Sequence, residues 1–131
     1  MLQCIVVTPE RTLYDQPAEF VAVMLFDGEI GIAAGHTPLV GRLGCGELRV
    51  RRDETHADHY YIEGGFVEVL NDVVSILTQR AVPVEEIDEA VAQEQLSFAR
   101  SRPATTAEAM AIRDRTVERS RAQLHIVRRV R

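Results

Sequence analysis

The sequence changes character at Ala81-Val82-Pro83, and this change limits what the chain can fold into. Before it, short runs rich in Val, Ile, Leu and Phe are separated by turn-forming residues, which is typical of β domains. After it, glycine is absent and Ala, Glu, Gln and Arg dominate, which favours helices. The sequence therefore predicts a β domain over residues 1–82 and a helical segment over residues 83–131.

The runs of β-forming residues have the spacing of a sandwich. The most regular pair covers residues 66–70 and 73–79, and the polar residues Asn71 and Asp72 between them predict a hairpin. The other predicted strands cover residues 4–8, 19–26, 29–33, 47–52 and 59–63. This pattern predicts an N-terminal antiparallel β-sandwich of two packed sheets.

Residues 83–131 predict an antiparallel hairpin of two helices. Four acidic residues soon after Pro83 favour the N-terminal end of a helix that starts there, and Pro103 stops it after Arg102. Thr105 or Thr106 then caps the second helix. The apolar stripe expected on the second helix consists of Met110, Val117, Leu124 and Val127.

Charge and composition exclude several classes of protein. No run approaches the roughly 18 consecutive apolar residues of a membrane span, and residues 2–7 lack the features of a signal peptide, so we expect a cytoplasmic chain. Cys4 and Cys45 are too few for a disulfide framework or a metal knuckle and are interpreted as free thiols.

The positive charge is concentrated at the end of the chain. The net charge is −5, yet residues 100–131 contain nine arginines and three acidic residues, a net charge of +6. A helix of that sign favours an acidic partner surface. The alternatives are a solvated helix face and a nucleic-acid-binding module, and the negative total charge and the lack of an aromatic stacking pattern argue against the second.

Four glycine motifs occur in one order within residues 28–69. They are G-E-I-G at 28–31, G-H-T-P-L at 35–39, G-C-G at 44–46 and G-G-F-V-E-V at 64–69. In this order and spacing they resemble the epsilon subunit of bacterial F-type ATP synthases, and the likeness extends over essentially the whole chain. The resemblance implies a sandwich that binds a shaft and a membrane ring, and a hairpin that folds down or extends.

The implied function is that of a non-catalytic rotor subunit that couples the gamma shaft to the ring of c subunits during proton-driven ATP synthesis. The implied ring contacts are Gly28, Glu29 and Ile30, and the implied shaft contacts are Thr37, Pro38 and Leu39. The resemblance places the chain on the cytoplasmic face of the bacterial inner membrane, attached only through the complex. It requires no catalytic residue.

In a subunit of this kind, the Arg-rich tail favours a second role, in which the C-terminal helices inhibit ATP hydrolysis. The candidate contacts with acidic segments of the alpha and beta subunits are Arg113, Arg115, Arg119 and Arg121. An alternative function is a stand-alone nucleotide-sensing or protein-interaction module whose hairpin opens and closes.

Some members of this family bind ATP at the hairpin through the motif [IL]-D-x-x-R-A. Ile87 and Asp88 match its first two positions, but Val91 replaces the arginine whose charge and donors would hold phosphates. We therefore expect no nucleotide cofactor.

Two histidine-containing segments have competing interpretations. His56, Asp58 and His59 provide three potential metal ligands in four residues, but residues 53–58 predict a polar hairpin loop, and a metal site would need further ligands from a rigid element. His36 follows Gly35 in a constrained segment and is expected to form a local hydrogen bond. Leu39 is a candidate for the core as well as for the shaft.

Overall fold

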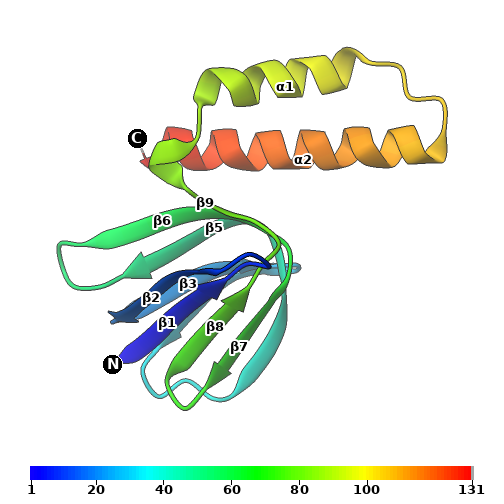
Figure 1. Ribbon diagram of the computed structural model, residues 1–131. Helices are drawn as coiled ribbons and strands as arrows, with labels where there is room; N and C mark the ends of the chain where they lie inside the picture. Colours follow the sequence, from blue (N-terminus) through cyan, green and yellow to red (C-terminus); the bar gives the residue numbers. More distant parts are fainter. Residues whose placement is uncertain (131) are drawn as a thin grey trace. The chain divides into compact units, whose positions relative to one another are not determined.

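The computed structural model describes residues 1–130 (Figure 1). They form two compact units that meet between Pro83 and Val84 in the sequence. The first unit consists of strands and the second of helices. The nine strands of the first unit are β1 (Leu2–Val7), β2 (Thr12–Ala18), β3 (Phe20–Leu25), β4 (Gly28–Ala33), β5 (Leu39–Arg51), β6 (Ala57–Glu63), β7 (Phe66–Leu70), β8 (Val73–Leu77) and β9 (Ala81–Pro83).

The strands form two sheets that share one long strand, β5. Its residues 39–42 pair with β7 in the first sheet, whose order is β2-β1-β8-β7-β5. Its residues 45–51 pair with β6 in the second sheet, which contains β4, β3, β5, β6 and β9. Neighbouring strands are antiparallel except β1 and β8, which run parallel. The predicted sandwich of two sheets is thus confirmed.

The core lies between the two sheets and follows from the alternation of side chains along each strand. Val67 and Val69 of β7 face inward, and so do Val74 and Ile76 of β8. The second sheet contributes residues such as Leu48 of β5, and all of these belong to one buried cluster. Burying each such side chain contributes roughly 1.5–3 kcal/mol.

The hairpin between β7 and β8 has a turn that matches its residues. Asn71 and Asp72 have positive φ angles of 49° and 62°, as a two-residue type I′ turn requires. Gly65, just before β7, has φ 105°, and a Cβ atom there would overlap the carbonyl oxygen of Leu77. The predicted hairpin is confirmed. Only glycine fits at position 65, because a side chain would collide with Leu77 and the positive φ angle disfavours other residues.

Three strand segments were not predicted from the sequence: β2, the first half of β5 and the short strand β9. β2 contains Pro17 and has no clear alternation, which an edge strand tolerates because its outer side is unpaired. The first half of β5 contains Gly41, Gly44 and Gly46, and glycines indicate either turns or places where backbones approach closely. Gly44 and Gly46 allow close approach of Met24 and Leu25 of β3 where β5 passes between sheets.

The second unit begins with a single 3₁₀ turn, Val84–Glu86, and continues with α1 (Glu89–Ser101) and α2 (Ala107–Val130). The predicted start of the first helix immediately after Pro83 is wrong, because the side chain of Asp88 accepts a hydrogen bond from Val91 N (3.1 Å) and caps the helix there. The second cap is as predicted, since Thr106 Oγ1 accepts from Ala109 N at 3.0 Å.

The two helices pack through a small apolar interface. Ala92 and Leu96 of α1 meet Leu124 and Val117 of α2. Met110, which the predicted stripe included, is instead exposed.

Candidate partner-binding surfaces

The outer face of the first sheet carries an exposed apolar surface. Val40 is 72% exposed and Phe66 is 55% exposed, and Leu70 and Leu77 are also exposed. Phe66 lies directly opposite Leu77 in the β7–β8 ladder, so their side chains are neighbours on one face. We call these four residues the apolar face. A cluster of large apolar side chains in water marks a site where another molecule binds.

The sequence of β7 contains a signal for this surface. In Phe66-Val67-Glu68-Val69-Leu70 the inward positions are valines, yet two of the three outward positions are also apolar. A strand with only one covered face would carry polar residues there. Apolar residues on both faces of this strand are therefore a signal in the sequence for an apolar surface that a partner can cover.

An aromatic residue borders the apolar face. Phe26 is 73% exposed, and the guanidinium group of Arg42 lies 5.1 Å from the centre of its ring. Arg42 is the register partner of Phe66 on β7. The cation over the ring leaves the other ring surface open for contact.

The predicted ring-binding residues lie at the start of β4. Phe26 and Asp27 form the turn, so Glu29 is a strand residue opposite Met24 of β3. Its carboxylate is 3.7 Å from Arg49 Nη2, and its side chain is 45% exposed. Gly28 is exposed with φ 140°, whereas Ile30 packs against the core and offers little contact area.

Arg49 connects Glu29 to a second acidic residue. Arg49 Nη1 donates to Glu47 Oε1 at 3.2 Å, and the other carboxylate oxygen of Glu47 is 3.0 Å from His59 Nδ1. Glu47 is only 5% exposed, and its contacts with Arg49 and His59 offset the cost of burying its charge. Side-chain contacts on the second sheet therefore connect Glu29 through Arg49 to Glu47 and His59.

The predicted shaft-binding residues lie beyond the opposite end of β4. Thr37 and Pro38 are exposed, but Leu39 is half-buried and packs against the core. Its neighbour Val40 points outward and belongs to the apolar face. His36 Nδ1 donates to the carbonyl oxygen of Thr37 at 2.7 Å, the kind of local hydrogen bond expected for it.

The three residues that resembled metal ligands have separate partners. His56 contacts Asp53, whose pKa lies well below its usual range because it accepts hydrogen bonds from Thr55 N and from His56. Asp58 accepts from Tyr14 at 2.6 Å and pairs with Arg52 at 2.9 Å. His56 therefore belongs to a polar loop, whereas Asp58 and His59 belong to strand β6.

Tyr14 and Asp58 join β2 of the first sheet to β6 of the second. Burial raises the pKa of Tyr14 above its ordinary value, and its hydrogen bond to Asp58 raises it further. Tyr60 packs edge-on against the Tyr14 ring at 5.7 Å. These contacts close one side of the sandwich.

The four arginines predicted to inhibit hydrolysis do not share one face of α2. Successive helical residues are rotated by about 100°, so Arg115 and Arg119 lie together while Arg113 and Arg121 lie on other sides. Arg113 is paired with the adjacent Asp114 at 3.4 Å. Arg121 borders a groove between α1 and α2.

The remnants of the nucleotide motif have structural roles. Ile87 is 6% exposed and Asp88 caps α1, as described above. Val91 is 45% exposed. The motif positions therefore present one carboxylate, already hydrogen-bonded to the helix, and no cation.

Comparisons with known proteins agree with this architecture. Residues 1–84 match the family "ATP synthase, Delta/Epsilon chain, beta-sandwich domain". The chain is 44% identical to the ATP synthase epsilon chain of Rhodopirellula baltica over 127 residues, which cover 97% of this chain and 98% of that one. It is 35% identical to ATP synthase epsilon chain 1 of Methylococcus capsulatus, covering 95% and 84%.

Two solved structures share the fold. A chain in the Euglena gracilis mitochondrial ATP synthase, OSCP/F1/c-ring, superposes with a TM-score of 0.89 at 26% identity, covering 96% of this chain and 81% of that one. A chain of the Tetrahymena thermophila mitochondrial ATP synthase central stalk and c-ring superposes with a TM-score of 0.71 at 14% identity, covering 96% of both. That second likeness supports the fold alone.

The sandwich followed by a helical hairpin defines the class of delta and epsilon chains of rotary ATP synthases. Within that class, this chain belongs to the epsilon subunits of bacterial F-type ATP synthases. Neither α1 nor α2, the two α-helices within residues 1–130, is long and apolar enough to cross a membrane.

Proposed function

We propose that this chain is a non-catalytic subunit of the central stalk that joins the gamma subunit to the ring of c subunits and attaches to the membrane only through the complex. The observation that carries the proposal is the apolar face on a sandwich of the epsilon family. In this role the face is covered by the gamma subunit. Covering four large apolar side chains contributes several kcal/mol of binding energy, at about 25 cal/mol per Å² of apolar surface.

The two sets of candidate contacts are well placed for bridging two partners. Glu29 lies at the start of β4, and Thr37 and Pro38 follow its other end, so they mark opposite ends of one strand. A rigid strand between the two sites transmits torque without bending. In this proposal Glu29 meets the ring and the segment 37–40 meets the shaft.

The chain's own chemistry supports a role without catalysis. Two of its carboxylates have structural partners: Asp58 contacts Tyr14 and Arg52, and Glu47 contacts Arg49 and His59. The sulfur of Cys4 is buried in the core. In our proposal ATP chemistry belongs to other subunits, and this chain needs no cofactor and works at the cytoplasmic face of the inner membrane.

The test is co-purification of the full-length chain with the gamma subunit. We expect Phe66→Gln and Leu77→Gln to weaken the complex at least tenfold, because each removes apolar area from the interface and leaves the core intact. Phe98→Gln is the control, since Phe98 is equally exposed but lies on α1. Failure of the wild-type chain to bind gamma would refute the proposal, and equal loss with the control would refute the assigned face.

The C-terminal helices are proposed to inhibit ATP hydrolysis through their positive charge. This half of the proposal is supported by the net charge of +6 in residues 100–131 and by the exposure of Arg115 and Arg121. An alternative sensor function, in which the hairpin opens on a nucleotide, has less support because Val91 supplies no charge.

A further inference from the structure

The apolar face of the first sheet surrounds an acidic residue, Glu68. Glu68 lies on β7 between Phe66 and Leu70 and points outward with them, because strand side chains alternate. Its register partner on β5 is Val40, and its register partner on β8 is Ser75. Strand β7 lies between β5 and β8 in this sheet, and Figure 1 shows β7 and β8 side by side. A carboxylate therefore stands among large apolar side chains inside the sheet.

Glu68 is exposed and has no hydrogen-bond or ion-pair partner among residues 1–130. Arg42 shares this face of the sheet, since it lies two residues after Val40 on β5 and opposite Phe66. Its guanidinium group is directed at the ring of Phe26, 5.1 Å from the centre. A cation of the chain that lies diagonally across from Glu68 is thus engaged with another side chain.

A second carboxylate in the same row of the sheet has a partner. The row continues from Ser75 to Ile5 of β1 and then to Asp15 of the edge strand β2. The side chain of Gln3 donates a hydrogen bond to Asp15. Asp15, at the edge, is satisfied within the chain, whereas Glu68, among the apolar side chains, is left to the solvent.

A partner that covers the apolar face also removes water from Glu68. Loss of hydration without compensation is strongly unfavourable for a carboxylate, so a purely apolar partner surface is disfavoured. A cation placed opposite Glu68 compensates for the lost hydration and is held in one position by the apolar contacts around it. A single charge within an apolar surface thus discriminates between partners and fixes how they dock.

We propose that Glu68 determines which surface binds the apolar face: the covering surface of the gamma subunit carries an arginine or lysine that pairs with Glu68 and is surrounded by apolar side chains. This inference rests on the proposed function, in which gamma covers that face. The apolar neighbours supply contact area, and Glu68 supplies specificity and orientation. The site is separate from Glu29, the candidate ring contact on β4 of the second sheet.

The first experiment measures the affinity of the full-length chain for an assembly of alpha, beta and gamma subunits prepared without it. We expect at least a tenfold loss of affinity in Glu68→Gln and in Glu68→Leu, because both leave the cation of gamma buried and unpaired. Both variants should unfold within about 2 °C of wild type, since Glu68 has no partner in the folded chain. Affinity equal to or above wild type in Glu68→Leu would overturn the proposal.

The matched control is Glu54→Gln, which removes an exposed carboxylate of the sandwich from the loop between β5 and β6. Its affinity should equal that of wild type, because it changes the net charge of the chain as Glu68→Gln does but lies outside the apolar face. An equal loss of affinity in Glu54→Gln and Glu68→Gln would overturn the proposal, since total charge would then explain both.

The second experiment exchanges the two charges. Glu68→Lys should bind more weakly than Glu68→Gln, because two cations then face each other. The arginines and lysines of gamma are replaced by glutamate one at a time. One of these replacements should restore the affinity of Glu68→Lys at least tenfold and weaken the binding of wild type. Restoration by none of them would overturn the proposed pair.

The outcomes separate this inference from the proposed function. Failure of the wild-type chain to bind the gamma-containing assembly would refute both. If wild type binds and Phe66→Gln weakens binding, but Glu68→Gln binds as tightly as wild type, then gamma covers the apolar face and only the role of Glu68 is refuted.

Discussion

Cys4 lies in the core of the sandwich and is shielded from water. Burial raises the pKa of its thiol to about 12, and the negative charge of Asp15 adds to the rise. Below its ordinary pKa of 9.0 the thiol is neutral in both the folded and the unfolded chain, so its burial there costs no charge. Above pH 9 the unfolded thiol ionises and the folded one does not, so stability falls as the pH rises further.

This burial predicts slow alkylation of Cys4. At pH 8 the thiolate fraction of Cys4 should be about a thousandfold lower in the folded chain than in the unfolded chain, because folding raises the pKa of the thiol from 9.0 to about 12. Mass spectrometry of iodoacetamide-treated protein, with and without denaturant, measures the difference. Rapid labelling of Cys4 in the native chain would contradict the buried position.

Glu29 is exposed and its ion pair with Arg49 is loose at 3.7 Å. Glu29→Lys should therefore change the free energy of unfolding by only about 0.5 kcal/mol, while it reverses the charge offered to the ring. We expect weaker ATP-driven ion pumping by the assembled complex at normal subunit content. Arg51→Gln, which affects a similar exposed pair with Glu19, is the control. Unchanged pumping in Glu29→Lys would make Glu29 an ordinary surface residue.

At the scale of elements, the start of α1 depends on one side chain. Asp88→Ala removes the hydrogen bond to Val91 N and should destabilise the hairpin by about 1 kcal/mol, whereas Asp88→Asn keeps an acceptor and should cost much less. Hydrogen exchange of the amides in the first turn of α1 checks this. Equal effects of the two substitutions would show that the carboxylate charge matters more than the cap.

The short strand β9 extends the sandwich to Pro83, whereas the sequence predicted its end at residue 82. Ala81, Val82 and Pro83 pair with Ile62, Tyr61 and Tyr60 of β6, so a chain cut after Ala81 loses two of these three pairs. Truncation after Pro83 should leave a folded sandwich that still binds gamma, as shown by a cooperative thermal transition and by co-purification. A folded fragment without gamma binding would place the interface in the helices.

At the scale of the whole molecule, inhibition of hydrolysis should depend on the charge of α2. Replacing Arg113, Arg115, Arg119 and Arg121 with Gln should raise ATP hydrolysis by the assembled complex without loss of subunits. The wild-type inhibition should also weaken as salt rises from about 0.1 M to 1 M, where the Debye length falls from about 10 Å to about 3 Å.

Double variants can show which side of α2 makes the inhibitory contact, because these four arginines point in different directions. Arg115→Gln with Arg119→Gln changes one side of the helix, and Arg113→Gln with Arg121→Gln changes others. Equal hydrolysis by wild type and the fourfold variant, with intact assembly, would show that the arginines have no inhibitory role.

The sequence by itself determined the two-part architecture, the β7–β8 hairpin and the cap of α2, because these depend on local alternation, turn residues and helix caps. It also contained the family motifs. It did not reveal β2, β9 or the first half of β5, because their residues lack strong alternation and pair only through distant partners.

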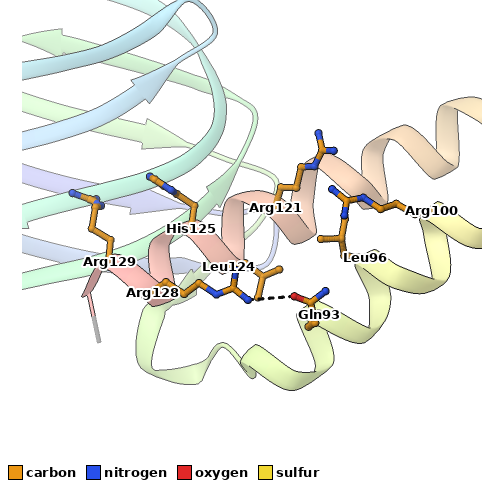
Figure 2. Close-up of a pocket in the computed structure, with 8 residues that line it drawn as sticks. All are labelled: Gln93, Leu96, Arg100, Arg121, Leu124, His125, Arg128 and Arg129. Atoms are coloured by element: carbon orange, nitrogen blue, oxygen red, sulfur yellow. Dashed lines mark hydrogen bonds between the residues drawn. The ribbon is translucent and has the colours of Figure 1, made fainter.

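The tertiary structure alone decided which apolar residues remain exposed. Leu39 and Val40 are adjacent and similar in sequence, yet the path of β5 between the two sheets directs Leu39 to the core and Val40 to solvent. Likewise, Arg100 and Arg121 are twenty-one positions apart in sequence and line one groove only because α1 and α2 pack against each other (Figure 2). Side-chain neighbours across sheets and helices are set by packing of the whole unit, which local sequence does not encode.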